Sequence, residues 1–309
     1  MLNNTIRILN FDDSIVSQLR LISRYKTEIV DLKDLGPGAR YWLDKKAGAE
    51  VEKRIRSSAK DSITFLGSGD FHHITSLLVD QFDEELCVIV FDFHPDWDIR
   101  PPRLGCGSWV NKVLENKNIL KFILIGVSSG DISSFRIQTA NLGSLKDDRV
   151  EIYPYSHAPT LAFFKKIPEN LSVRTKNFIL FSRIYWNELK NVNLVEFFLH
   201  ILRRLPAKRV YVSIDKDCLR NEYALTNWEE GRMSLEELLL VLKMIKDNLD
   251  IAGVDITGDY SREDIKGRFK RIAVYLDRPK NIRVKNTSES NIAAVNEATN
   301  LKILSLLNS

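Results

Sequence analysis

Cysteine is scarce in this chain, and its scarcity limits the class of protein. Only three cysteines occur, at positions 87, 106 and 218, and they are widely separated and odd in number. A small secreted domain held together by disulfides has more cysteines, in pairs. The sequence therefore predicts a protein of a reducing compartment, and we expect a cytoplasmic location.

Long apolar runs and a strong charge imbalance are also missing. No stretch approaches the roughly 20 apolar residues of a transmembrane helix, and the first residues, Met-Leu-Asn-Asn, do not begin a secretory leader. The net charge of +4, from 45 Lys and Arg against 41 Asp and Glu, is mild. No internal repeat or low-complexity linker divides the chain. We expect a single domain over residues 1–309 with neither a membrane nor a nucleic-acid partner.

Short apolar runs bounded by polar or turn residues are present instead. Runs of about four to eight apolar residues are typical of buried parallel strands. Six occur, at Ile63–Leu66, Leu86–Phe91, Phe122–Val127, Phe178–Phe181, Val210–Ile214 and Ile251–Ile256. The segments between them have helical periodicity. The alternation predicts an α/β fold of three layers, α/β/α, around a mostly parallel sheet.

Two helices and one loop can be placed with bounds. Ser234 and Glu237 form a capping box, which marks the start of a helix. Its apolar face repeats at helical spacing, at Leu235, Leu238, Leu239 and Leu242. A second helix is expected over Leu194–Arg204. The polar stretch Asn286–Asn296 predicts a loop before a terminal helix that ends near Leu307.

Clusters of potential metal ligands follow three of the expected strands. Residues 67–73 read Gly-Ser-Gly-Asp-Phe-His-His, residues 92–98 read Asp-Phe-His-Pro-Asp-Trp-Asp, and residues 215–217 read Asp-Lys-Asp. Ligands gather at the carboxyl ends of the strands in an open α/β sheet. The three clusters are therefore expected to meet in one site.

The spacing within the clusters favours metal binding. Side chains two residues apart point the same way on extended backbone, so Asp92, His94 and Asp96 can converge, as can Asp215 and Asp217. With a histidine of the first cluster, the set has four carboxylates and two imidazoles. It suits Mn²⁺, with Zn²⁺, Fe²⁺ or Co²⁺ as alternatives. Two such ions about 3.5–4 Å apart lower the pKa of a bridging water.

Each cluster alone has an ordinary structural explanation. An Asp-x-Asp pair is commonly a loop or a helix cap, and a glycine-rich segment with histidine is commonly a turn. Buried carboxylates without a cation are costly, however. The joint occurrence of the three clusters after three strands therefore favours a metal centre.

The clusters resemble the motifs of the ureohydrolases, the family of arginase, agmatinase and formimidoylglutamase. The family motifs Gly-Gly-Asp-His-Ser, Asp-Ala-His-x-Asp and Ser-x-Asp-x-Asp align with segments 69–73, 92–96 and 213–217. The resemblance covers about residues 60 to 275 and marks this chain as a divergent relative. It implies an arginase-like fold, two Mn²⁺ ions, a metal-bridging hydroxide as nucleophile, a small amine-type substrate and a homo-oligomer.

The resemblance also implies how the six ligands are divided. One ion would be bound by His72 and Asp96, and the other by His94 and Asp217. The carboxylates of Asp92 and Asp215 would bridge the two ions. Asp96 would in addition orient the hydroxide, which makes it the first candidate catalytic residue.

Departures from the family concern the substrate and the proton donor. Gly258 stands where family members that hold a guanidinium have a glutamate, so Asp259, one residue on, is the candidate substitute. The family histidine that assists proton transfer has no counterpart in the Gly-Cys-Gly-Ser-Trp segment. Cys106 is the catalytic candidate there, and Ser108 and Trp109 are candidate substrate contacts.

His73 is a further catalytic candidate, as a proton carrier beside the site, with a buried structural histidine as the alternative. The sequence as a whole predicts hydrolysis of a C–N bond in an amidino, guanidino or amide substrate. Two alternatives stay open: a deacetylase-like amidohydrolase with one Zn²⁺, and a non-catalytic metal-binding protein on the same fold.

Overall fold

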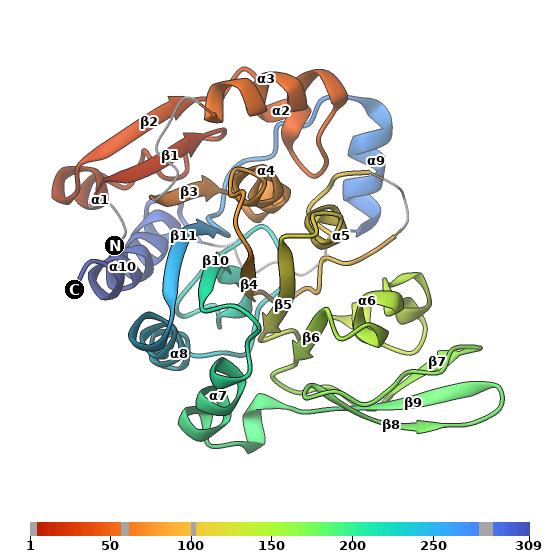
Figure 1. Cartoon of the computed structure of the whole chain (residues 1–309). Coiled ribbons are helices and arrows are strands. Elements are labelled where there is room, and N and C mark those ends of the chain that lie inside the picture. The colour runs from red at the N-terminus through yellow and green to blue at the C-terminus, as the bar shows by residue number, and fades with distance from the viewer. Residues whose placement is uncertain (1–4, 57–61, 100–102, 278–286) are drawn as a thin grey trace.

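The computed structural model describes residues 5–56, 62–99, 103–277 and 287–309. An eight-stranded sheet forms its centre, in the order β2-β1-β3-β11-β10-β4-β5-β6, and all neighbouring strands are parallel (Figure 1). The strands are β1 (Ile6–Asn10), β2 (Thr27–Asp31), β3 (Ile63–Gly67), β4 (Leu86–Phe91), β5 (Ile119–Ile125), β6 (Val150–Tyr153), β10 (Arg209–Asp215) and β11 (Asp250–Thr257). The expected parallel sheet is confirmed.

Helices cover both faces of the sheet because alternate residues of its inner strands, most of them apolar, point to opposite faces. In β4, Val88 and Val90 belong to one apolar core, and Cys87 and Ile89 to the other. The first core includes α2 (Gly36–Ala39), α3 (Lys45–Ile55), α4 (Thr75–Val79), α5 (Trp109–Leu114) and α6 (Leu142–Lys146). The second includes α1 (Leu19–Arg24), α7 (Leu194–Arg203), α8 (Leu235–Asn248) and α10 (Glu289–Leu307). This is the expected three-layer α/β/α arrangement.

A second, smaller sheet lies at one side of the molecule. It is antiparallel, in the order β7-β9-β8, with strands β7 (Thr160–Phe163), β8 (Val173–Asn177) and β9 (Phe181–Trp186) (Figure 1). The strand predicted over Phe178–Phe181 is wrong, because most of that run forms the turn between β8 and β9. Ile179 is 97% exposed there. A four-residue apolar run has the same sequence pattern whether it is buried or at an exposed turn.

The other predicted elements agree with the structure except near the C-terminus. The capping box of α8 is present, with the Ser234 hydroxyl accepting from Glu237 N–H at 3.1 Å. The loop expected over 286–296 is wrong for most of its length, because α10 begins at Glu289; residue 286 lies outside the described residues. Asn296 is buried and exchanges two hydrogen bonds with the backbone of Leu225. Polar residues there thus make specific contacts within a helix.

Within the described ranges, no helix is long and apolar enough to cross a membrane. The remaining elements are short or border the pocket described below. They are α9 (Arg268–Asp277) and the 3-10 helices η1 (Gly69–Ile74), η2 (Gly130–Ile132), η3 (Arg136–Thr139), η4 (Leu189–Asn191) and η5 (Lys216–Cys218).

Candidate metal centre

The three ligand clusters meet at the carboxyl edge of the central sheet. His72 lies on η1, directly after β3, and Asp217 lies on η5, directly after β10. Asp92, His94 and Asp96 lie on the loop that follows β4. Since β3, β11, β10 and β4 are consecutive strands of the sheet, their ends are close together. The structure thus brings the three clusters together.

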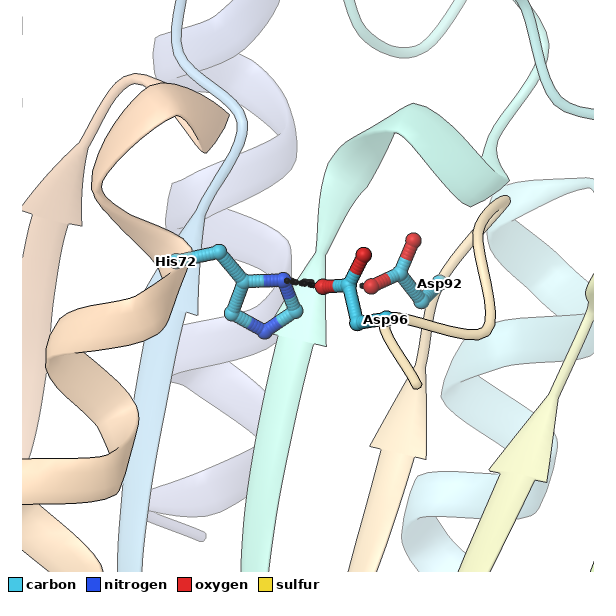
Figure 2. A group of neighbouring side chains, drawn as sticks. All are labelled: His72, Asp92 and Asp96. Carbon is cyan, nitrogen blue, oxygen red and sulfur yellow. Dashed lines mark ion pairs between the residues drawn. The ribbon is translucent and has the colours of Figure 1, made fainter. Parts of the chain in front are cut away.

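His72 points its Nδ1 atom at three carboxylates. The distances are 3.1 Å to Asp92 Oδ2, 3.2 Å to Asp96 Oδ2 and 3.5 Å to Asp215 Oδ2. Figure 2 shows the imidazole reaching from η1 toward the two aspartates of the β4 loop. All four side chains are buried. One imidazole nitrogen and several carboxylate oxygens thus surround a common point.

His94 forms a second group beside the first. Its Nδ1 atom lies 3.0 Å from Asp217 Oδ2 and 3.7 Å from Asp92 Oδ1. Asp92 therefore faces His72 with one oxygen and His94 with the other. One group consists of His72, Asp92 and Asp96, and the other consists of Asp92, His94 and Asp217. Within each group the ligand atoms lie within 4.8 Å of one another. The arrangement consists of two three-residue groups that share one carboxylate.

The far side of the His72 ring is fixed by a short hydrogen-bond chain. Its Nε2 lies 2.9 Å from the Ser213 hydroxyl, and that hydroxyl donates to Asp255 Oδ1 at 2.7 Å. A hydroxyl that donates to Asp255 accepts from Nε2–H, so in the neutral ring the lone pair is on Nδ1, facing the carboxylates. Histidines that bind metals are typically held in this way.

The His94 ring is held by a residue that the sequence analysis missed. Its Nε2 lies 3.2 Å from Glu229 Oε2. Glu229 reaches this point because the chain after η5 folds back on itself, with Gly231 N–H donating to the Leu219 carbonyl. A Cβ at Gly231 would lie 2.0 Å from the backbone of Cys218, so only glycine permits the close approach. Gly231 is the feature of the sequence that could have indicated this close return of the backbone.

Asp96 adopts an unusual backbone conformation, with φ at +48°. Aspartate tolerates this left-handed region better than most residues. Its Oδ2 atom accepts a 2.6 Å hydrogen bond from Nε1 of the fully buried Trp109. Burial and the neighbouring charge of Asp92 raise the pKa of Asp96 to about 7. Its position and its electrostatics are therefore both set by neighbouring groups.

The charge of the cluster fits a cation. Among the residues that the structure describes, no Lys or Arg forms an ion pair with any of the four ligand aspartates. Lys216, between two of them in sequence, pairs with Asp259 at 2.7 Å instead. Asp92 Oδ2 is buried and accepts no hydrogen bond from the described part of the chain. Burial and Asp92 raise the pKa of Asp217 to about 6. The donor set is what one or two hard divalent cations prefer.

A pocket of about 900 Å³ opens onto this cluster. Cys106 and Ser108, two of the predicted contacts, line it. Burial, with the charges of Asp96 and Asp70, raises the pKa of the Cys106 thiol well above its ordinary value. The Ser108 hydroxyl donates to the Arg103 carbonyl at 2.6 Å. Further carboxylates in the pocket wall are those of Asp98, Asp131, Glu229 and Asp277.

Three predicted residues lie outside the pocket wall. Trp109 lies behind Asp96 and contacts it through the hydrogen bond described above. His73 is completely buried, and burial and the nearby Lys270 lower its pKa to about 3, which leaves it neutral. Asp259 is also buried, where it accepts from Gln18 at 2.7 Å in addition to pairing with Lys216. These three side chains therefore do not line the pocket that opens onto the ligand cluster.

Gly258 occupies a backbone turn that leaves no room for a side chain. Its φ is +87°, and a Cβ there would lie 2.4 Å from Asp215 Oδ1 and 2.7 Å from the backbone nitrogen of Lys216. A glutamate at this position therefore does not fit the present backbone. Position 258 therefore cannot supply the side-chain contact that the ureohydrolase pattern places here.

Comparison with known structures identifies the fold as that of arginase-like ureohydrolases. Formimidoylglutamase from Bacillus subtilis subsp. subtilis str. 168 superposes with a TM-score of 0.59 at 13% identity, over 98% of this chain and 86% of that one. Entamoeba histolytica arginase, solved in complex with L-ornithine, superposes with a TM-score of 0.58 at 11% identity, over all of both chains. At these identities the likeness establishes the fold.

The sequence has a nearer relative than these structures. An uncharacterized protein of Thermotoga maritima is 28% identical over 255 residues, which are 82% of this chain and 79% of the relative. No protein-family model matches the chain.

Proposed function

We propose that the protein is a metal-dependent hydrolase that cleaves a C–N bond through a dinuclear centre. The observation that carries the proposal is the pair of ligand groups that share Asp92. One cation would be bound by His72 and Asp96 and the other by His94 and Asp217, with the carboxylates of Asp92 and Asp215 between them. The fold supports this function, because the similar structures include formimidoylglutamase and arginase.

The metal is proposed to be Mn²⁺, which suits four carboxylates and two imidazoles. A pair of such cations lowers the pKa of a shared water and stabilises negative charge that develops on the substrate. The chain's own residues supply the orientation. Trp109 holds the Asp96 carboxylate, which would accept a hydrogen bond from the attacking water. Ser213 and Glu229 fix the rings of His72 and His94.

The pocket favours a substrate with a cationic amidino or guanidino group. Four carboxylates outside the ligand set line it, and three of them have partners: Asp131 pairs with Arg136 at 2.6 Å, Asp277 accepts from the Tyr41 hydroxyl, and Glu229 contacts His94 at 3.2 Å. The contacts of Glu229 with His94 hold the pKa of Glu229 below its ordinary value despite burial, so it is ionised at neutral pH. We therefore assign to Glu229 the contact that Gly258 cannot make.

Metal analysis tests the centre. After incubation with Mn²⁺ and removal of free metal, the protein should retain close to two ions per chain. Asp92→Asn should retain far less, because it weakens both groups at once. Asp131→Asn, which changes a pocket carboxylate outside the ligand set in the same way, is the matched control. Wild-type protein that stays metal-free would contradict the proposal.

A substrate screen tests the chemistry. The Mn²⁺-loaded protein is incubated with guanidino, formimino and acylated amines, and the release of urea, ammonia, free amine and acetate is measured. Urea or ammonia from a cationic substrate supports the proposal. One Zn²⁺ per chain together with acetate release would identify the deacetylase-like alternative. Two bound ions without turnover of any compound would favour a binding protein.

A further inference from the structure

The small antiparallel sheet ends in an exposed apolar tip. Five large side chains lie there, at the end of β7 and in the turn between β8 and β9, and they are exposed by 42–97%: Phe163, Phe164, Phe178, Ile179 and Leu180. Figure 1 shows this sheet extending away from the central sheet. We call these five residues the apolar tip. Single exposed apolar side chains are common, whereas a contiguous group marks an interaction site.

The base of the same sheet is firmly packed. Ala162, Val173, Ile184 and Trp186 belong to the apolar core on one face of the central sheet. Trp186 Nε1 also donates to the Thr160 hydroxyl at 2.9 Å. The tip is therefore carried on a sheet anchored in the core, and its exposure is not that of a loosely attached loop.

Basic side chains flank the apolar tip along the chain. Five are exposed, and we call them the basic collar: Lys165, Lys166, Arg174, Lys176 and Arg183. Between Thr160 and Trp186 they are balanced by a single acidic residue, Glu169. None of the five forms an ion pair with a residue in the described part of the chain. The segment thus has four unbalanced positive charges.

Two members of the collar are placed unfavourably in the isolated protein. Lys176 and Arg183 lie directly opposite each other on neighbouring antiparallel strands, and like charges in that position repel. At the tip, Phe164 has a φ of +55°, a conformation that bulky side chains rarely adopt. The repulsion between Lys176 and Arg183 is costly without a partner that supplies negative charge.

We propose that the apolar tip and the basic collar form a docking site for an anionic phospholipid surface. Lys176 and Arg183 lie three residues back from Ile179 and Leu180, which is about 10 Å along a strand. Apolar groups at a membrane surface are buried about 5–10 Å into the boundary between headgroups and acyl chains. With the tip at that depth, the collar lies among the phosphates. Contact is peripheral, through side chains of one hairpin and its neighbouring strand.

Two other occupants fit the site less well. A symmetric contact between two copies would bring collar against collar, and the ten like charges would repel. A nucleic acid would neutralise the collar, but it offers no apolar environment for the aliphatic Ile179 and Leu180 at the very end of the turn. An anionic lipid surface complements both the charge and the apolar side chains.

Vesicle flotation of the full-length, Mn²⁺-loaded protein tests the proposal. We expect flotation with mixed phosphatidylcholine–phosphatidylglycerol vesicles and none with phosphatidylcholine alone. Lys176→Gln combined with Arg183→Gln should weaken binding about 30-fold, because each basic residue near an anionic surface contributes about fivefold. Ile179→Ser combined with Leu180→Ser should weaken it by at least as much. All four side chains are exposed or at the turn, so folding is retained.

Matched variants elsewhere on the surface are the controls. Lys117→Gln with Lys146→Gln makes the same charge change, and Leu19→Ser removes an apolar side chain that is 75% exposed; both should bind as wild type. The proposal is overturned if wild type does not prefer anionic vesicles, or if the tip and collar variants float as well as wild type. A lower molecular mass of the tip variant without lipid would instead identify a second copy as the occupant. Binding of RNA in place of vesicles would identify a nucleic acid.

Discussion

Asp96 illustrates what the spacing of residues can and cannot predict. Its place in the site followed from the Asp-x-His-x-Asp pattern after an apolar run, because alternate side chains converge on extended backbone. The hydrogen bond from Trp109 did not follow, and Trp109 was taken for a substrate contact. Glu229, 135 residues from His94, was missed altogether. Ligands that share a local period can be found in a sequence, whereas partners brought together by folding leave no such pattern.

The Trp109 indole should support Mn²⁺ binding through its hydrogen bond to Asp96 and not through packing alone. Trp109→Phe keeps the ring contacts with His72 but removes the 2.6 Å hydrogen bond. We expect Mn²⁺ affinity to fall about 10- to 100-fold, the usual effect of losing such a supporting contact, as measured by calorimetric titration. Trp186→Phe, which removes a similar indole hydrogen bond far from the ligands, should leave Mn²⁺ affinity unchanged. Equal affinities in both variants would assign Trp109 a purely structural role.

Gly258 should tolerate no side chain, for two separable reasons. In Gly258→Ala, positive φ costs about 1–2 kcal/mol, and the added Cβ pushes against the Asp215 carboxylate. Gly267→Ala has the same backbone problem, with φ at +99°, but open space around it. Urea unfolding should show a larger loss of stability for Gly258→Ala, and metal titration should show weakened Mn²⁺ binding for that variant alone. Unchanged Mn²⁺ binding in Gly258→Ala would mean that the Asp215 side chain can move aside.

Among the elements, the buried parallel strands were predicted best. β3, β4, β10 and β11 are buried on both faces, so most of their residues are apolar and follow one another in the sequence. β1 was missed because it contains Arg7, a fully buried arginine that donates to the Ile55 carbonyl at 2.8 Å. β2, at the sheet edge, is half exposed and polar in part. Apolar patterning thus finds the centre of the sheet but not its margin.

The first and last described helices are joined through one carboxylate. Glu297 of α10 accepts from the backbone N–H groups of Arg20 and Leu21, at 2.7 and 3.2 Å, and pairs with the Arg20 side chain at 2.6 Å. These bonds outweigh the effect of burial and lower the pKa of Glu297 below 4.5. A carboxyl group whose pKa is lower in the folded than in the unfolded protein stabilises the fold at pH values above its unfolded-state pKa. This stabilisation is lost as pH falls through the folded-state pKa.

Glu297→Gln should therefore destabilise the protein in a pH-dependent way. At pH 7 we expect a loss of about 1–2 kcal/mol in the free energy of unfolding, which shrinks toward zero as pH falls through the folded-state pKa of Glu297. Urea unfolding of both proteins across this range measures the difference. Glu289 lies on the same helix as Glu297 and forms an exposed ion pair with Arg262. Glu289→Gln, which removes this ion pair, should cost less than about 1 kcal/mol. A constant difference between Glu297→Gln and wild type at every pH would contradict this account.

At the scale of the whole molecule, metal binding should be a large part of the stability. The four ligand aspartates are buried with no Lys or Arg partner in the described chain, so folding without a cation brings their charges together. Mn²⁺ at 100 times its dissociation constant adds about 2.7 kcal/mol, which raises Tm by roughly 4 °C in a chain of this length. Calorimetry with and without a chelator measures this. Asp92→Asn should lose most of the Mn²⁺-dependent rise, and Asp131→Asn should keep it.

The strand order has a consequence for the synthesis of the protein. β3 and β4, which precede two of the ligand clusters, are neighbours in sequence but not in the sheet, where β11 and β10 lie between them. Asp215 ends β10, Asp217 follows it on η5, and β11 ends at Thr257. The ligands after β3 and β4, which the ribosome makes first, therefore cannot be held in their final positions until the chain has been extended past residue 257. We expect nascent chains shorter than this to bind the metal poorly, so that acquisition of the ion comes at the end of folding and marks the chains that have completed it.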